Sequence, residues 1–210
     1  MSSISIIGVG NMARAIGARA LAGGSTVELI GRDPDKAAAL ADALGRGATT
    51  RPFGSRPEGD IVVLAVPYGS TVPVVTQYGD LLADKVIVDI SNPFAPDATS
   101  LLTAKGSSAA QQIQAAAPAS AQVVKAFNTI FGQVLAALPV TTQLDVFLAG
   151  DDERAKKEVS AFVDSLRLRP LDAGSLAMAA VLEQAGLLVV GLAGHATGLG
   201  TFALGVTVFE

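Results

Sequence analysis

The chain of 210 residues has no cysteine, no tryptophan and a single histidine. The absence of cysteine excludes disulfides, thiolate metal sites, iron–sulfur clusters and a cysteine nucleophile. One histidine cannot form a site with several imidazole ligands, and no residue cluster has metal-ligand spacing, so no metal site is expected. Charged residues make up 16% of the chain and the net charge is −4. Because nucleic acids and anionic membranes bind clustered Lys and Arg, neither is an expected partner.

The sequence also has little that indicates targeting or insertion into a membrane. The N-terminus has no basic region followed by an apolar run, so we expect no signal peptide and a cytoplasmic protein. One uncharged stretch, Gly186 to Phe209, is long enough to cross a membrane, but it contains six glycines and His195. We interpret it as a buried helix, a Gly-rich break and a final strand or turn. Such an apolar terminus needs a partner surface, which predicts a homodimer.

Short apolar runs alternate with Ala-rich stretches along most of the chain. Seven runs rich in β-branched residues predict strands that are buried on both faces: Ser5–Gly8, Val27–Ile30, Ile61–Val66, Val86–Ile90, Val123–Ala126, Val146–Ala149 and Leu168–Leu171. Six stretches predict helices: Asn11–Ala22, Pro34–Leu44, Gly69–Gln77, Ala109–Ala116, Gly132–Ala137 and Asp152–Leu166. The alternation predicts an α/β fold, a Rossmann-type, doubly wound and mostly parallel sheet.

A glycine-rich turn follows the first predicted strand. Residues 8–13 read Gly-Val-Gly-Asn-Met-Ala, which has the form G-x-G-x-x-A. Gly8 permits a tight turn, Gly10 lets the backbone approach a pyrophosphate, and Ala13 allows close packing of the helix on the sheet. Arg14 and Arg19 are expected to point to solvent or to ligand phosphates. The strand, turn and helix together predict a dinucleotide site.

The end of the second predicted strand indicates which dinucleotide is bound. NAD-specific sites normally carry an acidic residue there, and this chain has Gly31, followed by Arg32 and Lys36. An arginine can grip a 2′-phosphate that a carboxylate would repel, so we expect NADP(H). In the alternative interpretation, Asp33 contacts the ribose and Arg32 is solvated. Pro34 favours Asp33 as a helix cap.

The pattern changes after Leu171. Asp172-Ala173-Gly174 predicts a turn, and the chain from Ser175 onward is mostly helical and apolar. We expect residues 1–172 to form an NADP-binding Rossmann domain. Residues 173–210 are expected to form a small, mainly helical C-terminal domain that carries the second-substrate site and the dimer contact.

Ligands of such sheets bind beyond the carboxyl ends of the strands, where this chain places neutral polar side chains. The relevant segments are Ala65-Val66-Pro67-Tyr68, Ile90-Ser91-Asn92-Pro93-Phe94 and Lys125-Ala126-Phe127-Asn128-Thr129. Lys125 precedes its strand end, and we interpret it as structural. The catalytic group stays open, with Asn128 and His195 as candidates. Scarce acid–base groups favour hydride transfer between two cofactors over carbonyl reduction, which needs a positioned proton donor.

The glycine-rich turn, Gly31-Arg32 with Lys36 and the strand-end segments occur in the same order as in the coenzyme F420-dependent NADP oxidoreductases, which the chain resembles. This group includes the oxidoreductase domain of the STEAP metalloreductases. Further matching segments are Val88–Ile90, Ala149–Asp152 and Pro170–Gly174. The resemblance implies hydride transfer between nicotinamide C4 and deazaflavin C5, usually in a dimer. It implies that the pyrophosphate is held by Gly8, Gly10, Asn11 and Met12, and the 2′-phosphate by Arg32 and Lys36. It implies that Ala65, Val66 and Pro67 flank the path to the nicotinamide, and that Asn92, Pro93 and Asn128 flank the stacked rings. Ala126 is also expected to contact the cofactor.

The C-terminal part both follows this family and departs from it. Residues 198–205 resemble the segment that covers the deazaflavin. Residues 176–180 are apolar, where the family often carries polar or arginine residues that hold the deazaflavin. We therefore expect an oxidoreductase that transfers a hydride between NADP(H) and an F420-type acceptor. Two alternatives stay open: an NADPH-dependent reductase of a small imine, carbonyl or flavin, and a non-catalytic dinucleotide-binding module.

Overall fold

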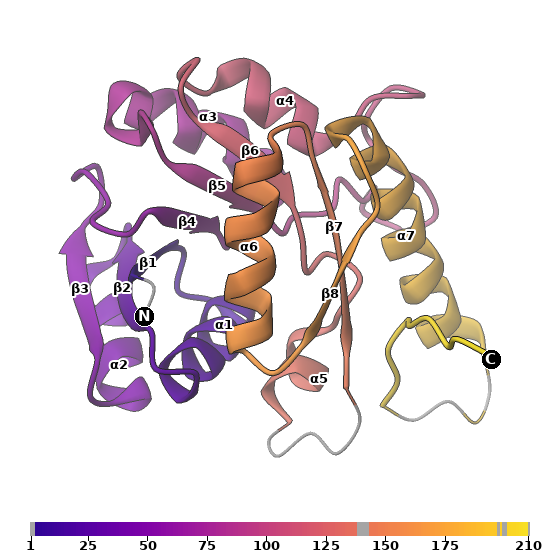
Figure 1. The fold of residues 1–210 in the computed structure, drawn as a ribbon, viewed down its shortest axis with the longest axis horizontal. Coiled ribbons are helices and arrows are strands. Elements are labelled where there is room, and N and C mark those ends of the chain that lie inside the picture. Colours follow the sequence, from indigo (N-terminus) through magenta and orange to yellow (C-terminus); the bar gives the residue numbers. More distant parts are fainter. Residues whose placement is uncertain (1–2, 138–142, 197, 199–200, 210) are drawn as a thin grey trace.

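A computed structural model of the chain describes residues 3–137, 143–196, 198 and 201–209. Its centre is an eight-stranded sheet with the order β3-β2-β1-β4-β5-β6-β7-β8 (Figure 1). The strands are β1 Ser3–Ile7, β2 Thr26–Gly31, β3 Ala48–Pro52, β4 Ile61–Leu64, β5 Val86–Asp89, β6 Gln122–Lys125, β7 Asp145–Gly150 and β8 Arg169–Asp172. All neighbouring pairs are parallel except β6 and β7. The order of the first six strands is that of a Rossmann sheet, which confirms the predicted fold class.

Helices cover both faces of this sheet. They are α1 Asn11–Ala22, α2 Pro34–Leu44, α3 Tyr68–Tyr78, α4 Ala109–Ala116, α5 Gly132–Ala136, α6 Glu153–Ser165 and α7 Ala179–His195, with 3-10 turns η1 Gly79–Leu82 and η2 Leu176–Met178. One apolar core joins the sheet to α1, α2, α5 and α6. The second joins the other face to α3, α4 and the start of α7. Within β1, Ile6 belongs to the first core and Ile7 to the second, because successive side chains point to opposite faces.

The sequence did not predict strand β3, which forms one edge of the sheet. Its residues Thr49 and Thr50 are exposed, so it lacks the apolar pattern of the inner strands. Arg51 of β3 instead pairs with the buried carboxylate of Glu28 on β2, which also accepts a hydrogen bond of 2.6 Å from Ser5 Oγ. Polar contacts therefore hold this edge strand, and a search for apolar runs misses it.

The expectation that Arg19 points to solvent or to a ligand was wrong. Arg19 belongs to α1 and is only 3% exposed. The guanidinium donates to the carbonyl of Leu135 in α5 and, over 3.1 Å, to that of Leu166 at the end of α6. Carbonyls in the last turn of a helix lack intrahelical partners, so a buried arginine satisfies two helix ends at once. Arg14, in contrast, is exposed.

The C-terminal part consists of η2, α7 and a tail that returns towards β7 and β8. Residues 176–195 form one helical segment that is long and apolar enough to cross a membrane, and a third of its most apolar window is buried here. In the tail, the amide of Val206 donates to Asp145 Oδ2 over 2.6 Å, and the ring of Phe202 packs edge-on against Phe131. Residues 201–209 form no strand, and residues 199–200 of the segment expected to cover a deazaflavin lie outside the described residues. The domain boundary near Asp172 stays a prediction.

Candidate active site

The turn between β1 and α1 lies where the strand order reverses, because β1 has β2 on one side and β4 on the other. Gly8 has φ of +127°, a conformation that side chains rarely adopt, and a Cβ there would lie 2.1 Å from the carbonyl oxygen of Ala65. Its amide donates to the carbonyl of Ile30 over 2.9 Å. The turn is therefore fixed between the ends of β2 and β4, and its first position requires glycine.

Gly10, two positions later, has the opposite environment. It is the exposed N-cap of α1, and a Cβ there would meet no atom of the described residues within 4 Å. The first turn of α1 has no side-chain cap and no acidic residue. The free N–H groups of this 12-residue helix therefore face open space, an arrangement that favours a bound anion.

The end of β2 is tightly packed around Gly31. A Cβ at Gly31 would lie 2.9 Å from Val9 Cγ1 and 3.2 Å from the carbonyl oxygen of Asp33. Asp33 caps α2 by accepting hydrogen bonds of 3.1 Å from the amides of Asp35 and Lys36. The bond from the Lys36 amide is the largest of the effects that lower the pKa of Asp33. The interpretation of Asp33 as a helix cap is confirmed.

Two cations stand near this corner. Arg32 is exposed, and its guanidinium lies 3.5 Å from Ser70 Oγ in the first turn of α3. Lys36 pairs with Asp33 over 3.3 Å, but both side chains are well exposed, so this pair contributes little to stability. Both cations can turn towards an anion beyond the end of β2.

A cavity of about 200 Å³ lies beyond the carboxyl ends of β5 and β6, on the far side of the glycine-rich turn. It brings together Met12, Asn92 and Asn128, three of the residues that the sequence predicted for the cofactor. Its remaining wall comes from α7 through Gly186, Val189 and Val190, and from Phe94, Phe127 and Phe131. None of the described residues that line the cavity is titratable.

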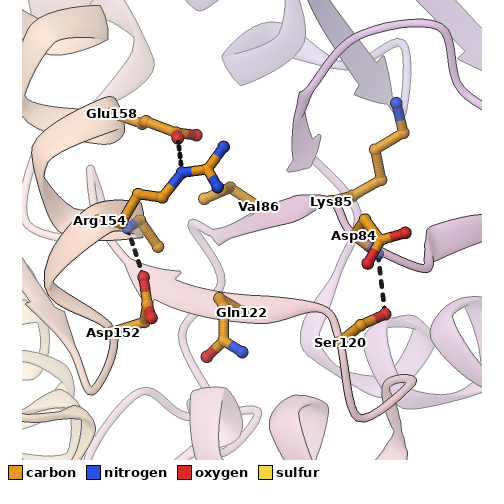
Figure 2. A pocket seen from close by; sticks show the side chains of 9 residues that line it. Asp84, Lys85, Val86, Ser120, Gln122, Asp152, Arg154 and Glu158 are labelled. Atoms are coloured by element: carbon orange, nitrogen blue, oxygen red, sulfur yellow. Dashed lines mark hydrogen bonds and ion pairs between the residues drawn. The ribbon is translucent and has the colours of Figure 1, made fainter.

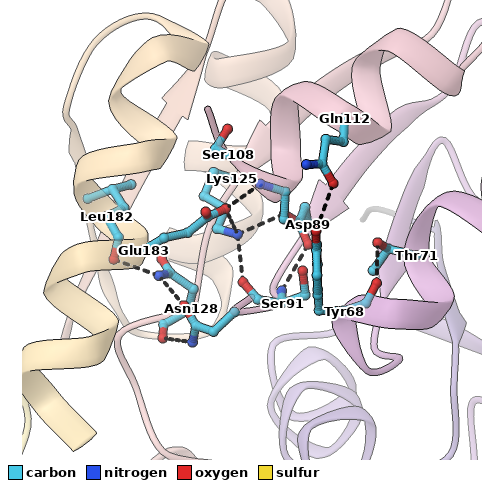
Figure 3. A network of polar contacts seen from close by, with 12 residues as sticks. Tyr68, Thr71, Asp89, Ser91, Ser108, Gln112, Lys125, Asn128, Leu182 and Glu183 are labelled. Carbon is cyan, nitrogen blue, oxygen red and sulfur yellow. Dashed lines mark hydrogen bonds and ion pairs between the residues drawn. The ribbon is translucent and has the colours of Figure 1, made fainter. Parts of the chain in front are cut away.

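The amide side chain of Asn128 joins the end of β6 to α7 (Figure 3), and that of Asn92 joins it from the end of β5. Asn92 Nδ2 donates to the carbonyl of Asn128 over 2.8 Å, and Asn128 Nδ2 donates to Asn92 Oδ1 over 3.0 Å. Asn128 Nδ2 also donates to the carbonyl of Leu182 in α7 over 2.8 Å. The buried Oδ1 of Asn128 has no hydrogen-bond partner within the described part of the chain. Buried polar atoms are rarely left unpaired, so this acceptor is suited to a donor on a ligand.

Other predicted site residues lie around this centre. Ala65, Val66 and Pro67 link β4 to α3, and Ala65 is the residue against which Gly8 packs. Pro93 and Ala126 are buried, and each is the chain neighbour of a residue that lines the cavity, Asn92 and Phe127 respectively. His195 is the exposed last residue of α7 and is not among the residues that line the cavity.

The sequence placed the second-substrate site within residues 173–210 but named no residue of α7 for it, and it gave no role to the aromatic side chains that line the cavity. Phe127 has a backbone φ of +60°, which is unusual for a large residue and marks local strain beside the cavity. Its ring is held edge-on against Phe162, with 6.3 Å between centroids. Gly186 in the apolar run of α7 was a local signal for a close approach, but Gly191 and Gly194 follow it in the same helix and have open space around them.

Lys125 lies behind the cavity, not in it. Its side chain is fully buried, and its ammonium donates to Asp89 Oδ2 and Glu183 Oε1, each over 2.8 Å (Figure 3). A third bond of 2.6 Å goes to the carbonyl of Ser91. This geometry agrees with the interpretation of Lys125 as structural.

A second cavity of about 390 Å³ lies at the opposite, amino-terminal ends of β5 and β6 (Figure 2). Its lining is mostly polar, and Arg154 there pairs with Glu158 over 2.7 Å. Asp152 serves there as the N-cap of α6. The cavity shares no residue with the candidate site.

The family and the relatives that the chain matches are all oxidoreductases. Residues 3–93 match the family described as NADP oxidoreductase, coenzyme F420-dependent. The chain is 31% identical over 180 residues to metalloreductase STEAP3 of Rattus norvegicus, covering 86% of this chain and 35% of that protein. It is 32% identical over 140 residues to the F420-dependent NADP reductase of Methanocaldococcus jannaschii, covering 64% of this chain and 62% of that protein. The chain thus spans less than two thirds of either of these relatives.

A solved structure supports the same relationship over the whole chain. A protein of Arthrobacter sp. FB24, described as a candidate F420-dependent NADP reductase, superposes with a TM-score of 0.86 at 25% identity. The match covers 99% of this chain and 100% of the other. Over residues 3–93 in sequence, and over its whole length in fold, the chain is similar to the coenzyme F420-dependent NADP oxidoreductases.

Proposed function

We propose that this protein binds NADP(H) and exchanges a hydride with a deazaflavin of the F420 type. The residues around the turn fit the cofactor. The N–H groups of α1 face open space at Gly10, so the backbone of Gly8 to Met12 would hold the pyrophosphate. Arg32 and Lys36 would hold the 2′-phosphate, because Gly31 leaves the end of β2 without the carboxylate of an NAD-specific site.

The nicotinamide end would lie over the cavity. Ala65, Val66 and Pro67 would flank the path to it. The unpaired Oδ1 of Asn128 offers an acceptor to a carboxamide N–H, while Asn92 holds the Asn128 side chain in place. Pro93 and Ala126 would support the lining residues next to them in the chain. When bound, the cofactor supplies or accepts a hydride at C4 of its nicotinamide ring.

We infer the type of acceptor from the residues that line the cavity. Reduction of a carbonyl needs a proton donor within hydrogen-bond reach of the oxygen. The described lining residues offer amide, hydroxyl and apolar groups, and His195 stands apart from them. Hydride transfer between two aligned rings needs positioning and exclusion of water, and these are what Phe127, Phe131 and the valines of α7 provide.

A small imine or ketone is the second candidate, because about 200 Å³ is below the usual size of a ligand pocket. Titration with NADPH and NADH, followed by stopped-flow mixing with F420, free flavins, imines and ketones, separates the possibilities. Rapid oxidation of NADPH by F420 is expected. Turnover with small acceptors alone would favour the second candidate. Tight binding of NADPH without any turnover would leave a non-catalytic nucleotide-binding module.

A further inference from the structure

Three charged side chains meet in the interior between the sheet and α7. Asp89 of β5, Lys125 of β6 and Glu183 of α7 have fully buried side chains. Glu183 Oε1 accepts from Lys125 Nζ over 2.8 Å and from the amide of Ala109, the first residue of α4, over 2.9 Å. One carboxylate thus joins α7 to both β6 and α4 (Figure 3).

A buried ion cluster of this kind is weak evidence for stability, because removing the charges from water costs about as much as their pairing returns. Its best-attested effect is to fix the register of the elements that it joins. An apolar helix such as α7 can slide along an apolar surface with little penalty. A carboxylate that must meet one ammonium allows a single position, so Glu183 sets where α7 lies on the strand ends.

The position of α7 decides the shape of the candidate site. Residues three, six and seven positions after Glu183 lie on the same side of the helix, and these are Gly186, Val189 and Val190, which line the cavity. The contact is close, because a Cβ at Gly186 would lie 2.7 Å from Asn92 Oδ1 and 3.3 Å from Asn128 Nδ2. A shift of α7 would therefore move one wall of the cavity and disturb both amides.

We propose that Glu183 is a positioning residue: through Lys125 and the amide of Ala109 it fixes α7 so that Gly186, Val189 and Val190 form the wall against which the second substrate rests. This role rests on the proposed function. Glu183 does not line the cavity and touches no reacting atom. Its removal should weaken use of the acceptor while leaving NADPH binding at the β1–α1 turn intact.

The test compares Glu183→Leu with Glu183→Gln in the full chain. Leu removes the acceptor oxygens and leaves Asp89 and Lys125 as a neutral pair, whereas Gln keeps an oxygen for Lys125 and for Ala109. For Glu183→Leu we expect KM for the acceptor to rise at least tenfold. The Kd for NADPH should rise less than threefold, because α7 also contacts Asn92 and Asn128 while the phosphate contacts at the β1–α1 turn are unchanged. Glu183→Gln should restore KM to within about threefold. The matched control Glu158→Gln, in an exposed pair on α6, should change neither quantity.

Hydrogen exchange measures the same role without activity. In Glu183→Leu, the amides of residues 186–190 should exchange at least tenfold faster, while those of α1 and α6 stay unchanged. If Glu183→Leu does not fold, Gly186→Ala keeps Asp89, Lys125 and Glu183 and places a methyl group against Asn92 Oδ1. It should raise KM for the acceptor by a larger factor than the Kd for NADPH. Unchanged KM in both variants, equal weakening of NADPH and acceptor, or faster exchange throughout the protein would overturn the positioning role. Failure of the starting protein to bind NADPH would instead refute the proposed function, and the exchange experiment would still report on Glu183.

Discussion

At the scale of single residues, the two glycines of the turn separate structural need from ligand binding. Gly8 is required by its backbone angle and by the carbonyl of Ala65, while Gly10 has open space around it. Gly10→Ala should therefore leave the melting temperature within about 2 °C and weaken NADPH binding at least tenfold, because the added methyl group occupies the approach of the pyrophosphate. Calorimetric titration and thermal melting measure both quantities.

Gly8→Ala is the matched comparison. It should lower the melting temperature by several degrees, since strain and a collision with the backbone act in the folded state itself. If Gly10→Ala binds NADPH normally, the open space at the helix N-terminus is not the pyrophosphate site.

Arg32 gives the second prediction at this scale. Hydrogen bonds to a charged group contribute roughly 1.5–3 kcal/mol, so Arg32→Ala should weaken NADPH by about 10- to 100-fold and leave NADH nearly unchanged. Lys157→Ala, an exposed cation on α6, serves as the control. Equal losses for NADPH and NADH would rule out Arg32 as the ligand of the 2′-phosphate.

Residue-level chemistry was predictable from the sequence where it depends on neighbours in the chain. The Gly8 turn, the missing acid at Gly31 and the Asp33 cap are of this kind. Gly186 lines the cavity, and Glu183 lies behind it, on a helix far along the chain from Asn128. A sequence pattern carries no register between such distant elements. The prediction for Arg19 was wrong for the same reason, because its two carbonyl partners belong to α5 and to the end of α6.

At the scale of elements, inner strands and their helices were predictable because burial on both faces produces continuous apolar runs. Strand β3 was not predicted, because an edge strand needs no continuous apolar run. The antiparallel pairing of β7 with β6 also has no signal in the local sequence, since the direction of a strand depends on the path of the connection that precedes it. The apolar pattern of α7 predicted a helix but not which side would face the cavity.

The anchoring of α7 has a measurable pH dependence. Burial raises the pKa of Glu183, with Lys125 opposing this effect and Asp89 adding to it. Above the ordinary glutamate value of 4.5, the folded protein therefore holds a proton that the unfolded chain has released. Stability conferred by this group is present at low pH and is lost as pH rises through the raised pKa.

Glu183→Gln removes this titration. Urea denaturation from about pH 4.5 to 8 should show the starting protein losing free energy of unfolding relative to Glu183→Gln as pH rises, and the difference should level off once Glu183 is ionised in both states. A difference that is constant over this range, or that changes in the opposite direction, would show that Glu183 is not perturbed by burial.

At the scale of the whole molecule, the homodimer predicted from the apolar C-terminus stays a prediction. Val181 and Leu188 of α7 are more than half exposed, which gives that helix an apolar outer side as well as its buried one. Sedimentation should show a dimer, and Leu188→Asp should shift it towards monomer without loss of helix content. A monomer at high protein concentration would instead show that α7 is simply exposed to solvent.

The central claim is that this molecule binds a phosphorylated dinucleotide at the β1–α1 turn and presents its nicotinamide to the cavity under α7. The most direct measurement is calorimetric titration of the folded protein with NADPH and NADH, side by side. The account predicts saturable binding of NADPH in the micromolar range, at least tenfold tighter than that of NADH. A folded sample that binds neither nucleotide at millimolar concentration, or that prefers NADH, would contradict it.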